Sequence, residues 1–336
     1  MHLTIRADGG SDIGYGHLVR TTALAREAHS RGHTVTYATT TPSAVRDVCS
    51  VPIETVTLPV RDDPSPFVDW IRRTNPDVAY TDAYPVDTNY QCAVREQIPL
   101  VVAQDDARHT ICADAFVNGN LYANELTYDY VEPEPVWHLG PEYLLLRDEV
   151  ARLAKETPPW RETVSEVLIT MGGSDIRGMT PTAMCALDGL EANLTVVIGP
   201  GFSNGNEIRR MASDVEICCS VVETPPNLLE LMFDADLAIT ACGSTVYELL
   251  ALGTPAVAVV QAANQRHIAS VLNDKNLATV LPFDTSVADI RAAVFDLLDN
   301  PVQRRRYREN GQNIVPATGS KNVCDVVIST SEQSFL

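Results

Sequence analysis

The first residues that could do chemistry lie in a glycine-rich turn near the N-terminus. It reads Gly9-Gly10-Ser11-Asp12-Ile13-Gly14-Tyr15-Gly16-His17 and stands between an apolar strand and a helix. Gly14 and Gly16 would let backbone approach a ligand, and a helix N-terminus offers unpaired N–H groups to an anion. His17 would project beside that anion, and the helix N-terminus favours its neutral form, which can accept a proton. The alternative is a capping or packing histidine.

A second turn, Met171-Gly172-Gly173-Ser174-Asp175, repeats the pattern in the second half of the chain. It ends a strand and precedes a helix, so Ser174 could donate to a phosphate. Further on, Gln261-Ala262-Ala263-Asn264-Gln265-Arg266 follows a buried strand. The neutral amides of Asn264 and Gln265 suit the hydroxyl and amide groups of a neutral sugar, although in isolation they indicate a helix cap as readily.

The third turn, Ala241-Cys242-Gly243-Ser244-Thr245-Val246-Tyr247-Glu248-Leu249, offers an anion site with a carboxylate nearby. Gly243, Ser244 and Thr245 stand where a strand gives way to a helix. Glu248 follows one helical turn later, about 6 Å along the axis and on the same face. A pyrophosphate at the helix N-terminus and a ribose diol on Glu248 would fit this spacing. The alternative for Glu248 is a solvated helix residue.

Strands that alternate with helices must position these turns. The first half predicts strands over 3–7, 35–38, 78–80 and 100–103, with helices over 18–30 and 67–73. After the linker Thr157-Pro158-Pro159-Trp160, the second half predicts strands over 167–171, 194–198, 237–240 and 255–260 and a helix over 287–298. The pattern indicates two Rossmann-like α/β domains, 1–157 and 158–336, each with a parallel doubly wound sheet. Such sheets bind ligands at their carboxyl ends, which we expect to face a shared central cleft.

Composition limits the partners and the compartment. The 336 residues are 45% hydrophobic, enough for two cores, and no apolar run approaches the roughly 18 residues that span a bilayer. The N-terminus lacks the features of a signal peptide, so we expect a cytoplasmic protein without an integral membrane segment. A formal charge of −19 argues against a nucleic-acid partner. This acidic surface, with Lys155, Lys275 and Lys321 as its only lysines, indicates a halophile-like cytosol of high ionic strength.

The eight cysteines form no Cys-x-x-Cys pair, so zinc and thioredoxin-type sites are not indicated. We expect buried free thiols. No carboxylate cluster stands where it would hold magnesium against a diphosphate, and Asp105-Asp106 is a weak candidate. We therefore expect neither a metal site nor a cofactor.

Taken together, five ordered motifs resemble a known family. They are IRADGGSDIGYGHLVR, TDAYPVD, LGPEYLLLRDE, MGGSD and CGSTVYELLALGTPAVAV…NQ, and they span residues 5 to about 265. This order is similar to that in the UDP-sugar hydrolases of the pseudaminic-acid pathway and in spore-coat polysaccharide proteins. Both belong to the wider GT-B group, which includes the UDP-GlcNAc transferase of peptidoglycan synthesis. After Gly-Gly-Ser-Asp, Ile176, Arg177 and Gly178 replace the proline and asparagine that are common in the family.

The resemblance implies a GT-B fold with the nucleotide on the C-terminal domain and the reacting sugar facing the N-terminal one. The family's general base matches His17, and its sugar-site tyrosine and asparagine match Tyr84 and Asn264. Its phosphate-contacting pair matches Gly243-Ser244, and the ribose-binding glutamate of the wider group matches Glu248. The implied reaction is metal-independent, inverting hydrolysis of a UDP-linked amino or deoxy sugar by water that His17 activates.

Two other functions remain open. A glycosyltransferase would use the same site to deliver the sugar to an acceptor instead of water. Tyr84 with Asn264 favours the hydrolase, and the chain shows no strong membrane-docking patch. A non-catalytic protein that binds nucleotide sugars would keep the Gly243 turn and lose the base, so His17 argues against it. A hydrolysing 2-epimerase would need acidic catalytic residues that we do not find.

Overall fold

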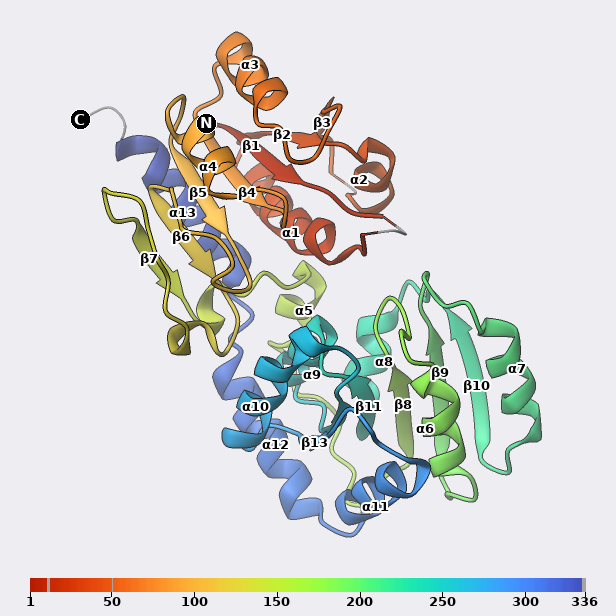
Figure 1. Ribbon diagram of the computed structural model, residues 1–336. Helices are drawn as coiled ribbons and strands as arrows, with labels where there is room; N and C mark the ends of the chain where they lie inside the picture. The colour runs from red at the N-terminus through yellow and green to blue at the C-terminus, as the bar shows by residue number, and fades with distance from the viewer. Residues whose placement is uncertain (11–12, 50, 334–336) are drawn as a thin grey trace. The chain divides into compact units, whose positions relative to one another are not determined.

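The computed structural model describes residues 1–10, 13–49 and 51–333, which form two compact α/β units (Figure 1). The first unit contains residues 1–148 and 317–336, and the second contains 149–316. Each unit is built around one parallel sheet. Among the described residues, no helix is long and apolar enough to span a bilayer.

The sheet of the first unit has seven strands in the order β3-β2-β1-β4-β5-β6-β7. They are β1 (His2–Ala7), β2 (Thr34–Thr39), β3 (Glu54–Thr57), β4 (Val78–Asp82), β5 (Leu100–Ala103), β6 (Ala115–Asn118) and β7 (Val136–Leu139). The α-helices are α1 (Gly16–Ser30), α2 (Pro42–Val48), α3 (Ser65–Thr74), α4 (Thr88–Arg95) and α13 (Gly319–Gln333). Two 3₁₀ turns, η1 (Ala123–Glu125) and η2 (Pro141–Tyr143), complete the unit.

Helices cover both faces of this sheet, as expected where all strands are parallel. One face of β1 carries Leu3, Ile5 and Ala7, which pack with α1, α2 and α13. On the opposite face, β4 and β5 pack with α3 and α4 around Phe67 and Tyr90. Because both faces are buried, the functional side chains of this unit lie where the strands end.

The second sheet has six strands in the order β10-β9-β8-β11-β12-β13. They are β8 (Glu166–Thr170), β9 (Asn193–Ile198), β10 (Cys218–Glu223), β11 (Leu237–Ala241), β12 (Ala256–Val259) and β13 (Thr279–Leu281). The helices are α5 (Asp148–Leu153), α6 (Met179–Leu187), α7 (Gly205–Asp214), α8 (Leu228–Asp234), α9 (Ser244–Leu252), α10 (Arg266–Asp274), α11 (Val287–Leu298) and α12 (Pro301–Ile314), with the 3₁₀ turn η3 (Ala263–Gln265). The main core packs α6, α7 and α11 on one face, while α8 and α9 contact the sheet from the other side.

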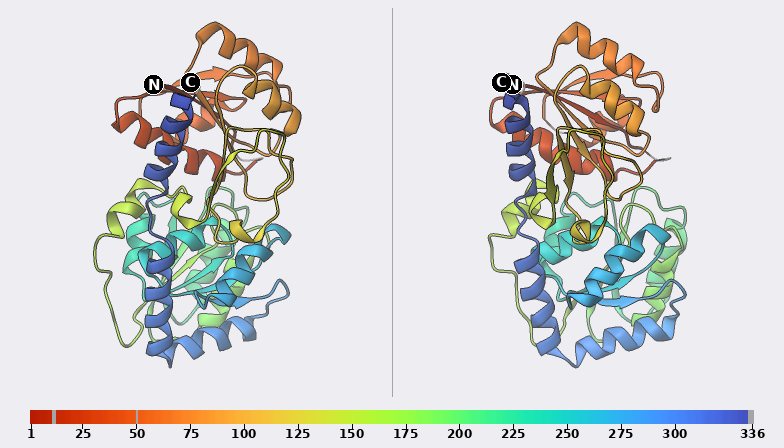
Figure 2. Two further views of the ribbon diagram at one scale, coloured as in Figure 1. Left: turned by 90° about the vertical axis from the view of Figure 1, so that its left-hand side faces the viewer. Right: turned by 60° about the vertical axis from the view of Figure 1, so that its left-hand side comes forward.

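The C-terminal helix belongs to the first unit, so the division at 157/158 differs from the structure. Val323, Cys324, Val326 and Val327 of α13 join the core of β1 and α1. Figures 1 and 2 show α12 on the second unit and α13 as a separate helix on the first. Helical periodicity alone did not reveal this return.

The predicted linker around Trp160 is packed against the second unit. Arg304, whose side chain is fully buried, donates to the carbonyls of Arg161 at 3.2 Å and Glu162 at 2.5 Å. Arg308 donates to the carbonyl of Pro159, and three guanidiniums of α12 lie within 5.6 Å of the Trp160 ring. The chain therefore passes between units near Asp148 and not at the prolines.

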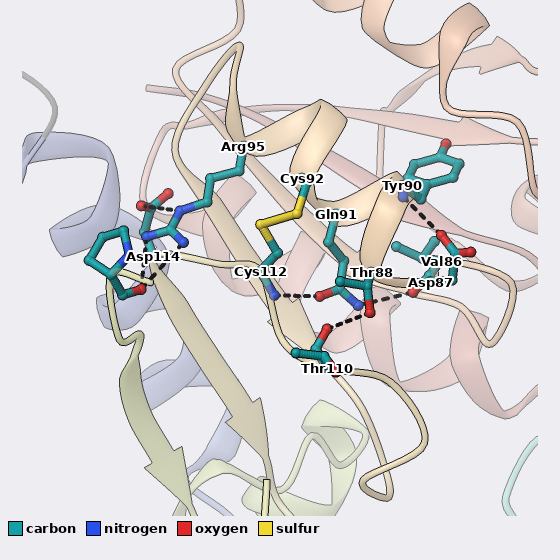
Figure 3. The surroundings of a disulfide bond; sticks show 11 residues. Val86, Asp87, Thr88, Tyr90, Gln91, Cys92, Arg95, Thr110, Cys112 and Asp114 are labelled. Carbon is teal, nitrogen blue, oxygen red and sulfur yellow. Dashed lines mark hydrogen bonds and ion pairs between the residues drawn. A yellow bond between two sulfur atoms is a disulfide. The ribbon is translucent and has the colours of Figure 1, made fainter. Parts of the chain in front are cut away.

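The expectation that all cysteines are free and buried is wrong. Cys92 of α4 and Cys112, in the segment before β6, form a disulfide with a Cα–Cα distance of 5.4 Å (Figure 3). Beside it, the backbone N–H of Cys112 donates to the Gln91 side chain at 2.9 Å. Cys185 and Cys218 are exposed thiols. The two cysteines are 20 residues apart, and the sequence did not reveal the pair because only the folded chain brings them together.

Candidate active site

His17 occupies the start of the first helix. The helix begins at Gly16, two residues earlier than the predicted Leu18, and its N-cap residue Tyr15 makes no side-chain cap. The first N–H groups of α1 therefore have no side-chain acceptor at the N-cap, as an anion-binding turn requires. The His17 side chain is largely buried, with 8% of the residue exposed.

Asp82 holds the imidazole from the end of β4. Its Oδ1 lies 2.8 Å from His17 Nδ1, and the carboxylate is almost fully buried. Burial alone would raise the pKa of Asp82, but the charges of Arg20 and then His17 outweigh burial and lower it well below its usual value. An ionised carboxylate only accepts hydrogen bonds, so a hydrogen bond with Asp82 requires a hydrogen on Nδ1. Arg20 Nη2 lies 2.9 Å from the same nitrogen and could donate to it only in the other tautomer. We assign the hydrogen to Nδ1, because a charged carboxylate is the stronger partner. The neutral ring then carries its lone pair on Nε2, as a general base needs.

Arg20 and Asp105 extend this pair into a network. One helical turn after His17, Arg20 donates to both oxygens of Asp82 at 2.5 Å and to Asp105 Oδ1 at 2.6 Å. Asp105, which follows β5, also accepts from Asn120 Nδ2 at 3.2 Å. The network therefore joins residues from α1 and from the ends of two adjacent strands.

Tyr84 lies beside the base. Its ring meets the His17 ring edge-on, with centroids 4.6 Å apart, and its hydroxyl donates to Asp105 Oδ2 at 3.3 Å. Arg108 stacks over the same ring at 3.8 Å. Burial, followed by the charge of Asp105, raises the pKa of Tyr84 to about 12, so the hydroxyl stays protonated at neutral pH. With 42% of the residue exposed, Tyr84 can contact a ligand.

The acidic pair after β5 is occupied by arginines. Asp105 pairs with Arg20, and Asp106 binds Arg108 at 2.6 and 2.8 Å. Within 1–10, 13–49 and 51–333, no cluster of three or more histidine, cysteine or acidic side chains could hold a metal ion. The weak magnesium candidate Asp105-Asp106 is thus engaged by two cations of the chain itself.

In the second unit, the N-terminus of α9 has the properties of an anion site. Gly243 is its extended N-cap and supplies no side chain to the first N–H groups of Ser244 and Thr245. Gly172, with φ of +80°, approaches closely: a Cβ there would lie 3.5 Å from the Thr245 hydroxyl. Helix N–H groups, a hydroxyl and bare backbone suit a phosphate. Glu248 lies further along α9 and is largely buried, with 7% exposed.

The N-terminus of α6 is closed by the protein itself. This helix starts at Met179, later than the turn predicted, and Asp175 accepts from the N–H groups of Met179 at 2.8 Å and Thr180 at 2.7 Å. The helix expected after this turn is present, but four residues, Asp175 to Gly178, separate Ser174 from its start. The local carboxylate satisfies those donors and would repel a phosphate there.

The amide pair after β12 is divided between two environments. Gln265 Oε1 accepts the backbone N–H of Gln261 at 2.7 Å, and its Nε2 lies 3.8 Å from where a Cβ of Gly243 would stand. This brings Gln265 to the α9 N-terminus as a further donor. Asn264 lies in η3, one residue earlier, and is exposed.

Asp82 and Arg20 were not identified as site residues from the sequence, and Asp105 was considered only as a weak magnesium candidate. Asp82 and Arg20 stand inside motifs that resemble the family, TDAYPVD and GHLVR, but no spacing rule joins residues 62 positions apart. The available signal was that each carboxylate follows a predicted strand, because the carboxyl ends of adjacent parallel strands meet at one edge. Pairing of β1 with β4 and of β4 with β5 confirms that adjacency.

The two parallel-sheet α/β units have the GT-B fold. The fold matches that of MurG from Acinetobacter baumannii with a TM-score of 0.70 at 16% identity, over 98% of this chain and 99% of that one. Residues 166–321, most of the second unit, match the glycosyltransferase family 28 C-terminal domain. The expected fold of two Rossmann-like α/β units is confirmed.

Three proteins are similar to this chain in sequence over most of its length. The spore coat polysaccharide biosynthesis protein SpsG of Bacillus subtilis is 24% identical over the whole of both chains. UDP-2,4-diacetamido-2,4,6-trideoxy-beta-L-altropyranose hydrolase of Campylobacter jejuni is 23% identical over 82% of this chain and 97% of its own length. A Methanocaldococcus jannaschii protein, MJ1062, is 27% identical over 79% of this chain, a match that spans only 57% of that protein. The chain is therefore similar over most of its length to the spore-coat and UDP-sugar hydrolase relatives, and this similarity supports the family inferred from its motifs.

Proposed function

We propose that this protein hydrolyses a UDP-linked amino or deoxy sugar at the anomeric carbon and releases UDP. The observation that carries the proposal is the 2.8 Å contact between Asp82 Oδ1 and His17 Nδ1, which leaves Nε2 as the basic nitrogen. The uncapped N-terminus of α9 supports a diphosphate leaving group. The altropyranose hydrolase among the relatives supports the reaction class.

In this reaction, water is the nucleophile. Its oxygen attacks the anomeric carbon while His17 Nε2 takes the water proton, and the bond from that carbon to the phosphate oxygen breaks. The electron pair goes to UDP, whose growing charge faces the N–H groups of α9. Attack opposite the leaving group inverts the anomeric configuration. The residues in these roles need no metal ion.

The remaining residues have binding roles in this proposal. Tyr84 and Asn264 contact the sugar, and Glu248 binds the ribose diol. The turn at Gly243, with Gly172 and Gln265 beside it, completes the nucleotide site. The proposal assigns the nucleotide to the second unit and activation of water to the first.

A panel of UDP-sugars without added acceptor tests the function. We expect UDP and free sugar in equal amounts, with water oxygen at the anomeric carbon when the reaction runs in ¹⁸O-water. Release that depends on an acceptor would instead show a glycosyltransferase, the second candidate. That candidate is favoured by the family 28 domain and the glycosyltransferase neighbours. Binding without turnover would indicate a nucleotide-sugar binding protein.

The relatives' names also indicate a pathway. We infer that the released sugar enters glycan or nonulosonic-acid biosynthesis, as the name of the spore coat relative suggests for polysaccharide. We further propose a cytoplasmic location and, on the basis of the −19 charge, adaptation to salt. Higher thermal stability in molar salt than in dilute buffer would support the adaptation, and equal stability would contradict it.

A further inference from the structure

Arg20 joins the two carboxylates of the first unit, and we propose that it is a positioning residue for both His17 and Tyr84. The inference rests on the proposed function for its kinetic consequences, but its geometric claim does not need turnover. Arg20 stands in the GHLVR part of the first motif.

The guanidinium uses three of its nitrogen atoms on two carboxylates. Its Nε and one terminal nitrogen bind both oxygens of Asp82, and the other terminal nitrogen binds Asp105. The terminal nitrogen on Asp82 also lies 2.9 Å from His17 Nδ1, so Arg20 contacts the imidazole directly as well. Burial would lower the pKa of Arg20, but the charges of Asp105 and Asp82 outweigh it and raise the pKa well above its usual value. A permanently charged, planar group therefore holds Asp82 through two hydrogen bonds on one edge and Asp105 through one on the other.

Each carboxylate in turn orients one side chain. Asp82 binds His17 Nδ1 at 2.8 Å, and Asp105 accepts the Tyr84 hydroxyl at 3.3 Å. Two carboxylates face one guanidinium, so the cluster carries one excess negative charge. A proton taken up by His17 cancels it. Arg20 thus connects the group that holds the base with the group that holds the sugar-facing tyrosine.

A coupling experiment on the ligand-free protein tests the geometry. The readout is the ring ¹⁵N and Nδ1–H signal of His17 in histidine-labelled protein. Asp105→Asn is expected to shift this signal through Arg20, although Asp105 does not contact the imidazole among the described contacts. Asp106→Asn is the matched control. It removes the same charge at the next residue, but the Asp106 carboxylate pairs with Arg108 and not with Arg20. Equal shifts in the two variants would overturn the proposal.

Substitution of Arg20 tests whether the effect of Asp105→Asn on His17 passes through the guanidinium. In Arg20→Lys, an ammonium keeps the charge but lacks the planar fork, so Asp105→Asn should no longer move the His17 signal. Arg20→Met should behave alike, and the lysine variant preserves the test if methionine prevents folding. Persistence of the Asp105 effect in a folded Arg20 variant would show that coupling does not pass through Arg20.

Kinetics separate positioning from general structural support. Asp82→Asn should lower kcat, and Asp105→Asn should mainly raise KM. Arg20→Lys should lower kcat and raise KM, each by about tenfold or more, which is the loss typical of orienting groups. Unchanged kcat and KM in Arg20→Lys would overturn the role in catalysis. If the wild-type protein hydrolyses no UDP-sugar, the proposed function fails, while the NMR result still decides the positioning role.

Discussion

Gln265 accepts the backbone N–H of Gln261 through its side-chain oxygen at 2.7 Å, which turns its N–H₂ group toward Gly243. A side-chain amide is thereby oriented by one backbone donor, with no charged residue involved. Gly243 supplies no competing side chain, so the donors at the start of α9 stay available to a ligand. Asp175 does the opposite at α6, where its carboxylate occupies the helix N-terminus.

This contrast predicts that Gly243→Asp abolishes UDP binding. Gly243 has an extended backbone, and an added Cβ would meet only Gln265 Nε2 at 3.8 Å, so aspartate fits. Its carboxylate would cap α9, stabilising the helix by about 0.5 kcal/mol, and would repel the diphosphate. Calorimetric titration with UDP measures the loss. Gly243→Ala is the control and should bind UDP nearly normally; equal loss in both variants would contradict an electrostatic cause.

Removal of the base should affect rate and leave nucleotide binding intact. His17→Ala is expected to lose at least about 10²-fold in kcat, as for removal of a general base. UDP affinity should change little, because the diphosphate site is assigned to α9. Steady-state kinetics on the best UDP-sugar and titration with UDP give the two quantities. Unchanged turnover would remove His17 from the mechanism.

Asp82→Asn keeps the shape of the orienting residue and removes its charge. An asparagine N–H₂ can donate to Nδ1, which favours the tautomer with its hydrogen on Nε2 and no lone pair for water. We expect a kcat loss on the order of 10³-fold or more, in line with the same change in a serine-protease triad. The ¹⁵N shifts of the His17 ring should exchange their protonated and unprotonated values. A variant with the original tautomer and full activity would contradict this role.

Acid should destabilise the first unit through Asp82. Arg20 and His17 hold its folded-state pKa below the value of about 3.9 in an unfolded chain. Its stabilising contribution is therefore present above about pH 4 and is lost as pH falls toward the folded-state pKa. Amide exchange in β1 and β4 between about pH 5 and pH 3 measures it. Asp82→Asn should flatten that pH dependence; an equally steep loss would assign it to other carboxylates.

Chelation should not affect turnover. Asp105 and Asp106 are paired with Arg20 and Arg108, so a divalent cation would have to displace an arginine from each. We expect the same rate after dialysis against EDTA and after addition of magnesium. Loss of activity in EDTA that magnesium restores would contradict the metal-independent reaction.

Arg304 should be among the most costly polar residues to replace in the second unit. It is fully buried and donates to the carbonyls of Leu297 and Leu298 at the end of α11, as well as to Arg161 and Glu162. Arg304→Met would leave buried carbonyls without donors, at a cost of about 3 kcal/mol. Arg306→Met, on an exposed neighbour, should stay within about 0.5 kcal/mol. Urea unfolding compares them, and similar losses would contradict the assigned role of Arg304.

The buried strands were predictable because their apolar runs are continuous. The strand expected over 100–103 and the helix expected over 287–298 have the observed bounds. Strands β3, β6, β7, β10 and β13 were missed. Four of them are edge strands with half-exposed or exposed residues, whereas β6 is an interior strand of only four residues, all buried. An edge strand lacks an apolar run, so its pairing depends on neighbours far away in the chain.

The site residues were predictable where a local turn defines them. His17 and Gly243 are found at helix starts, because glycine turns after strands are visible in a short window. Asp82 and Asp105 depend on which strands lie side by side, which a single sequence does not show. A local turn can also mislead. The turn before Asp175 resembles an anion site, but α6 starts only at Met179, and the Asp175 carboxylate accepts the first N–H groups of that helix.

The return of α13 to the first unit bears on how the protein is made. The core around β1 needs Val323, Cys324 and Val327, which leave the ribosome only after the entire second unit has been synthesised. An emerging domain usually completes its fold before the next one is translated. Here the earlier half must wait with an apolar face uncovered, so the nascent chain offers chaperones a binding surface until α13 has emerged.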